Sequence, residues 1–138
     1  MSLRNVLLFL MATLFAAPLS LAGDDTAKEG TTLVYELRTY TANPGKMADL
    51  HKRFRDHTMQ LFEKHGMKNI GYWVPMDKPD TLVYLIAHKS RKAAAESWKA
   101  FMTDPEWQQV YKESHKNGVL VKHVDRQFLT PTDYSPIK

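Results

Sequence analysis

The sequence predicts an α+β domain of the ferredoxin-like class, a β-α-β-β-α-β sandwich in which a four-stranded antiparallel sheet carries its helices on one face. Two observations lead to this prediction. Strand-like alternation and helix-like periodicity follow one another in that order along residues 32–138. A turn rich in proline and aspartate at residues 75–80 then joins the two middle strands into a hairpin.

The first strand is expected over residues 32–41, where apolar and polar side chains alternate before a turn at Asn43-Pro44-Gly45. Alternation separates two faces of this strand. The first face carries Leu33, Tyr35, Leu37 and Thr39, and the second carries Val34, Glu36, Arg38 and Tyr40. The second face combines two opposite charges with a phenol, which favours the wall of a cavity.

A helix is expected over residues 46–65, because its apolar residues recur at spacings of three, four and seven. The apolar stripe consists of Met47, Leu50, Phe54, Leu61 and His65, with His57 and Thr58 inside it. The charged remainder, which includes Arg53, is interpreted as a solvated face. Gly66 is expected to end the helix in the left-handed conformation.

The elements of the second half of the domain are predicted from the same kinds of pattern. Strands are expected over residues 67–74, 81–88 and 119–129. Ser90 is the expected N-cap of a second helix, and Asp104-Pro105-Glu106 begins a further one that ends near Gly118. Aspartate as N-cap, proline at the first position and an acid in the first turn are typical of a helix start. Residues 131–138 form a tail.

Residues 1–22 are interpreted as a secretory signal peptide. Arg4 supplies the positive charge, residues 6–19 are apolar, and Ser20-Leu21-Ala22 is a small-x-small cleavage site. Residues 23–31 then form a flexible leader, and residues 32–138 form one domain. We expect the mature protein to be periplasmic or extracellular and free of the membrane. The alternative is an uncleaved N-terminal anchor.

Composition excludes several classes of function. Nineteen Lys and Arg face fifteen Asp and Glu, and the two signs are interleaved, so no nucleic-acid footprint is predicted. The absence of cysteine excludes disulfides, thiolate metal sites and a Cys nucleophile. His51, His57 and His65 lie six and eight residues apart, which does not suit a metal site. No cofactor is predicted, although a haem site with a single histidine stays open.

The segment Glu36-Leu37-Arg38-Thr39-Tyr40, followed by Pro44-Gly45-Lys46, resembles the opening of the NIPSNAP domain. Further matching motifs follow in order: His65-Gly66, Gly71-Tyr72-Trp73, Arg91, Asp104-Pro105-Glu106-Trp107, and Leu129-Thr130-Pro131-Thr132-Asp133-Tyr134-Ser135-Pro136. Together they cover essentially all of the mature chain. The resemblance implies a dimeric α+β barrel and brings no reaction with it, because the family has no single agreed activity.

With all helices on one face of the sheet, the other face is expected to be bare within one copy. By alternation the bare face is predicted to hold Glu36, Arg38, Tyr40, Tyr84, Ile86 and His88. So many aromatic and aliphatic groups favour burial. A homodimer packed sheet to sheet would enclose them.

Glu36, Arg38 and His88 are the candidate catalytic residues. Arg38 could bind a carboxylate or phenolate, while Glu36 could act as a base or hold Arg38 in place. His88 ends its strand at the expected mouth of the cavity and could donate or accept a proton. The alternatives are an ion pair at a wet subunit interface and an exposed histidine at a strand end.

The candidate ligand-binding residues are Tyr40, Tyr72, Tyr84 and Arg91. Arg91 could instead form a salt bridge that joins strand to helix. His57 is interpreted as a hydrogen-bonded core residue. The residues Tyr72, Trp73, Trp98, Trp107 and Tyr111 are interpreted mainly as core, with one or two of them lining the pocket.

Two functions of different class follow. The first is an exported protein that binds a small organic ligand, with cofactor-independent oxidation or isomerisation of an aromatic or lactone-like compound as its reaction if it is an enzyme. The second is a non-catalytic protein-interaction module of the cell envelope.

Overall fold

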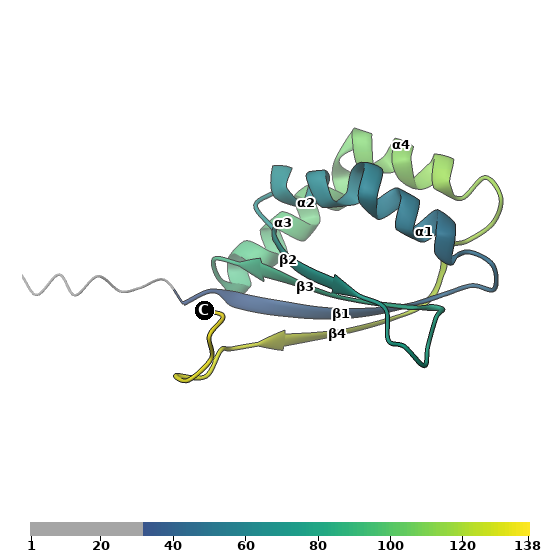
Figure 1. Cartoon of the computed structure of the whole chain (residues 1–138). Helices are drawn as coiled ribbons and strands as arrows, with labels where there is room; N and C mark the ends of the chain where they lie inside the picture. The colour runs from purple at the N-terminus through teal and green to yellow at the C-terminus, as the bar shows by residue number, and fades with distance from the viewer. Residues whose placement is uncertain (1–31) are drawn as a thin grey trace, which may run out of the picture.

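The computed structural model describes residues 32–138 (Figure 1), so the signal peptide and leader predicted for residues 1–31 lie outside the described residues. The strands are β1 (Val34–Ala42), β2 (Lys68–Trp73), β3 (Thr81–His88) and β4 (Val121–Leu129). The helices are α1 (Met47–Arg53), the π-helical η1 (Phe54–Thr58), α2 (Met59–Lys64), α3 (Arg91–Thr103) and α4 (Pro105–Ser114). In the described part of the chain, no helix is long and apolar enough to cross a membrane.

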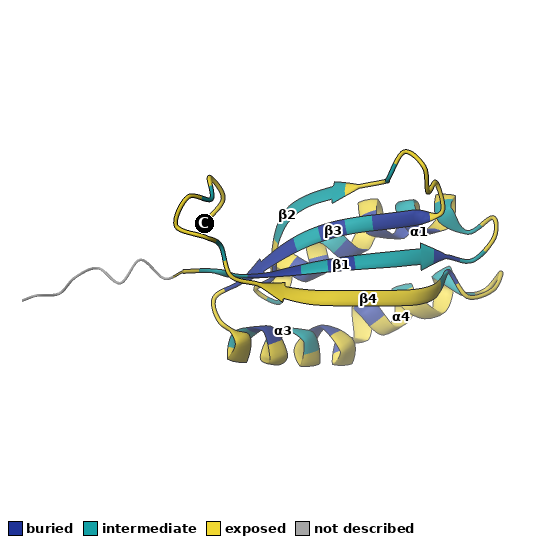
Figure 2. Cartoon of the chain, turned by 90° about the horizontal axis from the view of Figure 1, so that it is seen from below, coloured by how far each residue is buried: buried dark blue, intermediate teal, exposed yellow. Residues whose placement is uncertain are grey.

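The four strands form one antiparallel sheet in the order β2-β3-β1-β4. All helices lie on one face of it, and the other face is seen uncovered from below (Figures 1 and 2). This confirms the predicted ferredoxin-like sandwich. The hairpin of β2 and β3 and all four strands occur where expected, with ends that shift by two residues or fewer.

The helix starts and stops follow from the predicted capping residues. The Ser90 side chain accepts a hydrogen bond from the Ala93 amide at 3.0 Å, and Asp104 accepts one from the Glu106 amide at 2.8 Å. Gly66 has a φ of 78°, a left-handed conformation that favours glycine, and there the first helical run ends.

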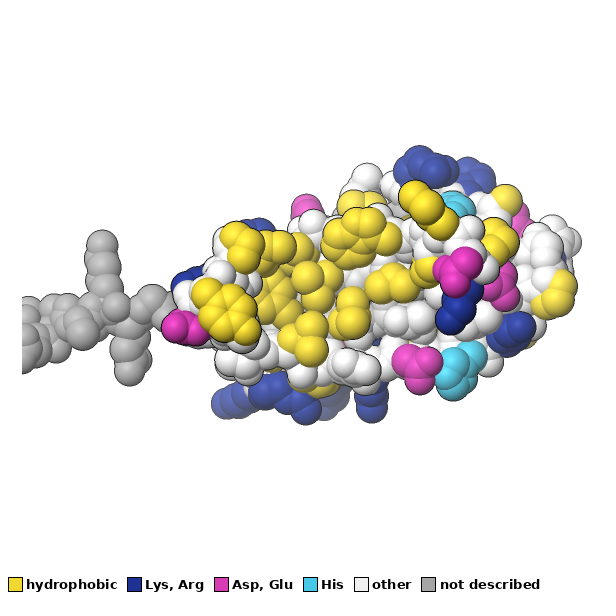
Figure 3. Space-filling model, turned by 60° about the horizontal axis from the view of Figure 1, so that its bottom comes forward, with side chains coloured by type: hydrophobic (Ala, Val, Ile, Leu, Met, Phe, Trp, Pro, Cys, Tyr) yellow, Lys and Arg dark blue, Asp and Glu magenta, His cyan; other side chains and the backbone are white. Residues whose placement is uncertain are grey.

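Alternation grouped the strand residues correctly but assigned the groups to the wrong faces. Glu36, Tyr84 and His88 are almost fully buried beneath the helices, together with Ile86 and Arg38. The bare face instead presents apolar side chains such as Leu37 and Leu85, which gather in a hydrophobic patch (Figure 3). The physical reason is that charged groups can face a protein interior when each finds a partner there.

The tail after β4 covers one end of the bare face. Residues of the tail and of the sheet line a shallow groove there, and Tyr35 at its base is only 4% exposed. The tail therefore belongs to the fold, and it leaves the middle of the bare face uncovered (Figure 2).

The helical run over residues 47–64 contains a π turn at η1 that the apolar pattern did not predict. The Met59 amide donates to the Phe54 carbonyl, and the Thr58 hydroxyl donates to the Arg53 carbonyl at 3.2 Å. The extra residue in this turn moves Thr58 to the centre of the buried stripe and His57 off it. His57 is therefore exposed, contrary to the prediction of a core histidine.

The prediction for Arg53 is wrong in the opposite direction. This residue was expected on the solvated face, but it is only 6% exposed. It lies on the flank of the stripe, where α4 packs against α1 and η1. Its guanidinium carbon lies 5.2 Å from the centre of the Trp107 ring and 5.9 Å from that of Tyr111. The rings of α4 thus provide a cover that no local pattern in α1 reveals.

Thr58→Val should lower the free energy of unfolding by about 1 kcal/mol, because the Arg53 carbonyl then loses its hydroxyl donor in a buried place. Urea denaturation measures this. The matched control is Thr103→Val, which removes an exposed hydroxyl that donates to the Lys99 carbonyl. A change at Thr58 no larger than at Thr103 would contradict a role for this hydroxyl in holding the π turn.

Candidate functional site

The Glu36 carboxylate is the centre of a buried polar cluster. Its Oε1 accepts from Arg38 Nη1 at 2.6 Å, and its Oε2 accepts from Trp98 Nε1 at 2.7 Å and lies 2.9 Å from His88 Nε2. Burial alone would raise the pKa of Glu36, but the hydrogen bonds from His88, Trp98 and Arg38 outweigh it and lower the pKa to about 2. Glu36 is therefore ionised at neutral pH.

Arg38 is held in one position by this cluster. Beside its bond to Glu36, Nη2 donates to the Tyr40 hydroxyl at 3.3 Å, and the guanidinium carbon lies 4.3 Å from the centre of the Trp98 ring. Its buried Nε has no hydrogen-bond partner among residues 32–138. The guanidinium lies on the wall of a cavity.

That cavity, of about 450 Å³, lies between the helices and the β1–β4 side of the sheet. We call it the aromatic cavity. Its rings are Tyr40, Phe54, Phe62, Trp98, Phe101, Trp107 and Tyr111, and its permanent cations are Arg38, Arg53, Lys122 and Arg126. Within the described residues, no acidic side chain lines it. It opens beside β4, since the side chains of this strand stay exposed although the helices lie on the same side of the sheet.

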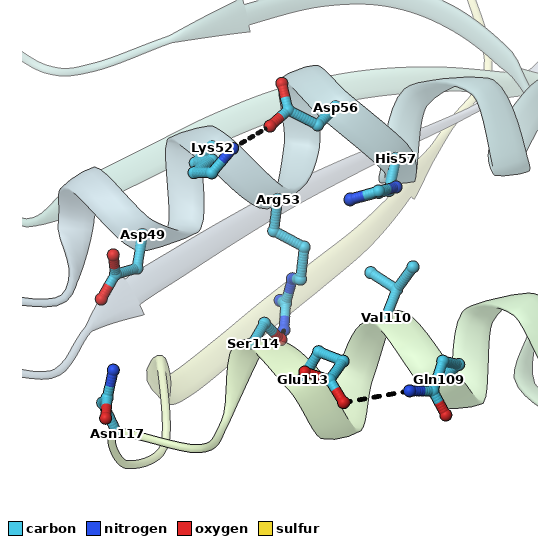
Figure 4. A pocket seen from close by; sticks show the side chains of 10 residues that line it. All are labelled: Asp49, Lys52, Arg53, Asp56, His57, Gln109, Val110, Glu113, Ser114 and Asn117. Atoms are coloured by element: carbon cyan, nitrogen blue, oxygen red, sulfur yellow. Dashed lines mark hydrogen bonds and ion pairs between the residues drawn. The ribbon is translucent and has the colours of Figure 1, made fainter.

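A second cavity of about 380 Å³ lies between α1, η1 and α4 (Figure 4). Most of its lining residues are polar or charged, and they include the acids Asp49, Asp56 and Glu113. Lys52 pairs with Asp56, and Gln109 donates to Glu113. Arg53 runs from α1 towards Ser114 of α4 and lines both cavities.

Arg53 differs from Arg38 in having no carboxylate partner in the part of the chain that the structure describes. Nη1 donates to the Ser114 hydroxyl at 3.3 Å, and the buried Nε has no hydrogen-bond partner there. Burial lowers the pKa of Arg53, against the opposing effect of the nearby Tyr40 hydroxyl. An arginine nevertheless stays charged at neutral pH.

The structure brings together most of the residues singled out from the sequence. Glu36, Arg38, Tyr40, Tyr84 and His88 form one neighbourhood, with the rings of Tyr40 and Tyr84 centred 5.2 Å apart. His88 lies behind Glu36 and does not line the aromatic cavity, so its predicted place at the cavity mouth is wrong. The catalytic roles of Glu36, Arg38 and His88 stay predictions.

The remaining two candidates do not line the aromatic cavity. Tyr72 stacks on Tyr84 with ring centres 5.3 Å apart and donates to Asn69, and like Tyr84 it is not part of the cavity wall. Arg91 is exposed, and its guanidinium carbon lies 3.3 Å from the centre of the Phe128 ring, not beside Glu36. Among residues 32–138, no group of three or more His, Asp or Glu side chains could hold a metal ion.

Sequence reasoning missed Arg53 and undervalued Trp98. The helical spacing places Trp98 on the inner face of its helix, which indicates a core residue. It does not reveal the hydrogen bond that the indole N–H donates to Glu36. Arg53 carried no signal, because a charged residue on an amphipathic helix normally faces solvent. Only its spacing of three from buried Leu50 places it at the edge of the stripe.

Acid should weaken the Glu36 cluster within a definable range of pH. The folded pKa of about 2 lies below the ordinary 4.5, so the stability that Glu36 contributes is complete above pH 4.5 and is lost as the pH falls towards 2. Glu36→Gln should flatten this loss and lower the free energy of unfolding at pH 7 by about 3 kcal/mol, because Arg38 loses its buried partner.

Urea denaturation at a series of pH values measures both effects. The matched control is Glu96→Gln, because Glu96 is exposed and, within the part of the chain that the structure describes, pairs only with Lys92. Parallel pH profiles for Glu36→Gln and wild type would show that Glu36 is not the group that titrates.

The NIPSNAP family model matches residues 35–136 of this chain. A NIPSNAP family protein of unknown function from Agrobacterium tumefaciens is 22% identical with a TM-score of 0.69, over 79% of this chain and 96% of that one. A second NIPSNAP family protein from the same organism is 25% identical with a TM-score of 0.69, over 77% and 99% of the two chains.

The fold extends beyond this family. A putative antibiotic biosynthesis monooxygenase from Nitrosomonas europaea is 13% identical with a TM-score of 0.56, over 75% of this chain and 94% of that one, a likeness of fold alone. No curated protein matches the chain at a significant level. Because the family model spans most of the 138 residues, the chain belongs to the NIPSNAP family.

Proposed function

We propose that this protein binds a small organic ligand in the aromatic cavity. The observation that carries the proposal is that two buried guanidinium groups, those of Arg38 and Arg53, lie on the wall of one cavity that is otherwise rich in rings. Its volume of about 450 Å³ falls in the range of small-molecule sites, and a few polar groups in an apolar wall are typical of them.

In this proposal Glu36 and His88 are positioning residues. Glu36 fixes Arg38 at the cavity wall, and His88 donates to Glu36 from behind. A carboxylate with a pKa of about 2 is a weak base at neutral pH. An oxidation or isomerisation of the ligand would therefore proceed without Glu36 as its base, and binding is the function that the geometry supports best.

Native mass spectrometry of protein purified from its own source tests this proposal. We expect a retained small molecule in the wild type and its loss in Val124→Trp, because Val124 of β4 lines the cavity and is 42% exposed, so a larger side chain can enter the cavity without disturbing the core. The matched control is Arg91→Gln, which changes a charged residue outside the cavity. A wild type without ligand, or retention in Val124→Trp, would contradict the proposal.

We also propose that the protein is exported, with cleavage after Ala22, and that it forms a homodimer through the bare face of the sheet. The signal-like composition of residues 1–22 supports export. The hydrophobic patch on the bare face supports the homodimer (Figure 3), since a contiguous apolar surface typically marks an interface. The same patch favours the alternative function, in which another exported protein binds there.

Light scattering coupled to gel filtration should give the mass of a dimer for the wild type. Leu37→Asp should shift the mass towards a monomer, since Leu37 lies in the middle of the bare face and a carboxylate there loses its water on association. The matched control, Asp49→Asn, changes a charge on the helical side. A monomeric wild type would contradict the homodimer. It would favour the alternative function, in which another exported protein binds to the patch.

A further inference from the structure

We infer that the ligand of the aromatic cavity is an aromatic carboxylate, and that Arg53 is the residue that binds its anionic group. The inference rests on the ligand-binding function proposed above and adds a chemical class and an anchoring residue to it. Three features of the cavity support it: an uncompensated charge, the absence of lining acids and a wall of rings.

The uncompensated charge is that of Arg53. Arg38 reaches Glu36 at 2.6 Å, whereas no carboxylate lies within ion-pair distance of Arg53 among residues 32–138. A neutral hydroxyl at 3.3 Å and two rings beyond 5 Å do not replace a counter-ion. Buried charges in proteins are normally paired, so this one marks the place of an anion.

The Arg53 guanidinium keeps one nitrogen for an anion. Nη1 donates to Ser114 and Nε is buried without a partner among the described residues, so Nη2 is the nitrogen left to donate to a carboxylate oxygen. A hydrogen bond from a guanidinium to an anion is charge-assisted and stronger than one between neutral groups.

Charge on the cavity wall favours an anion over a cation. Glu36 already compensates Arg38, so Arg53, Lys122 and Arg126 leave the wall positive. The second cavity differs, because Asp49, Asp56 and Glu113 line it. Walls of one charge sign in a partly closed site attract ligands of the opposite sign.

The aromatic rings of the cavity wall indicate which kind of group the ligand carries beside its anionic group. Trp107 and Tyr111, which lie against the Arg53 guanidinium, line the aromatic cavity and not the second one. An anion on Arg53 therefore has aromatic neighbours. A flat ring joined to that anion gains edge-to-face contacts in addition to the burial of its surface.

Isothermal titration calorimetry with 2-naphthoate and neutral 2-naphthamide tests the inference. The wild type should bind the carboxylate at least tenfold more tightly than the amide. Arg53→Met should lower the affinity for the carboxylate at least tenfold and leave that for the amide within twofold, because methionine fills the space without the charge. Arg53→Lys should recover part of the loss, and Arg91→Met should change neither affinity.

Thermal unfolding without ligand shows whether Arg53→Met still folds. Its melting temperature should equal or exceed that of the wild type, because the variant removes an unpaired buried charge. Equal affinities for the two probes in the wild type would overturn the anionic class while leaving ligand binding in place. Failure of both probes would overturn the inference, and a neutral co-purified molecule would then still support the proposed function.

Discussion

The Glu36 carboxylate is the group on which the arrangement of the sheet and α3 depends. It lies on β1, and its three partners come from β1, β3 and α3: Arg38, His88 and Trp98. Each partner brings a donor that would otherwise be buried without an acceptor. The cluster therefore allows the polar face of β1 to be the inner face of the sandwich.

This cluster also explains where the aromatic cavity lies. The bond from Trp98 to Glu36 ties α3 to the centre of the sheet at β1 and β3, and α4 turns away from it after Asp104. α3 reaches the inner side of β4 at Phe128, whose ring centre lies 3.3 Å from the Arg91 guanidinium carbon, but most residues of β4 remain exposed. The space between β4 and the rings of α3 and α4 is the cavity, so the interaction that closes the core at β3 leaves it open at β4.

Features set by neighbours in the sequence could be predicted, and features set by distant packing could not. Ser90, Gly66 and the Asp104-Pro105 start act through residues within one turn, so the order and ends of the elements followed from them. Alternation showed that Glu36 and Arg38 share a face, but which face the helices cover depends on Trp98, sixty-two positions away. The burial of Arg53 depends on the rings of α4, which leave no periodic signal in α1.

Arg38 and Arg53 lie on the same cavity wall, but they differ in what they contribute to the stability of the fold and to the proposed binding. Arg38 is paired, so its charge contributes to the fold and is only partly available to a ligand. Arg53 has no ion-pair partner among residues 32–138, and an apolar side chain of similar length would fit the same place without the desolvation of a cation. The Ser114 hydroxyl and the rings of Trp107 and Tyr111 contact this guanidinium, but none of them neutralises its charge. In the binding that we propose, the anionic group of the ligand supplies the missing counter-ion, and the proposal thereby gives a reason for a cation at this position.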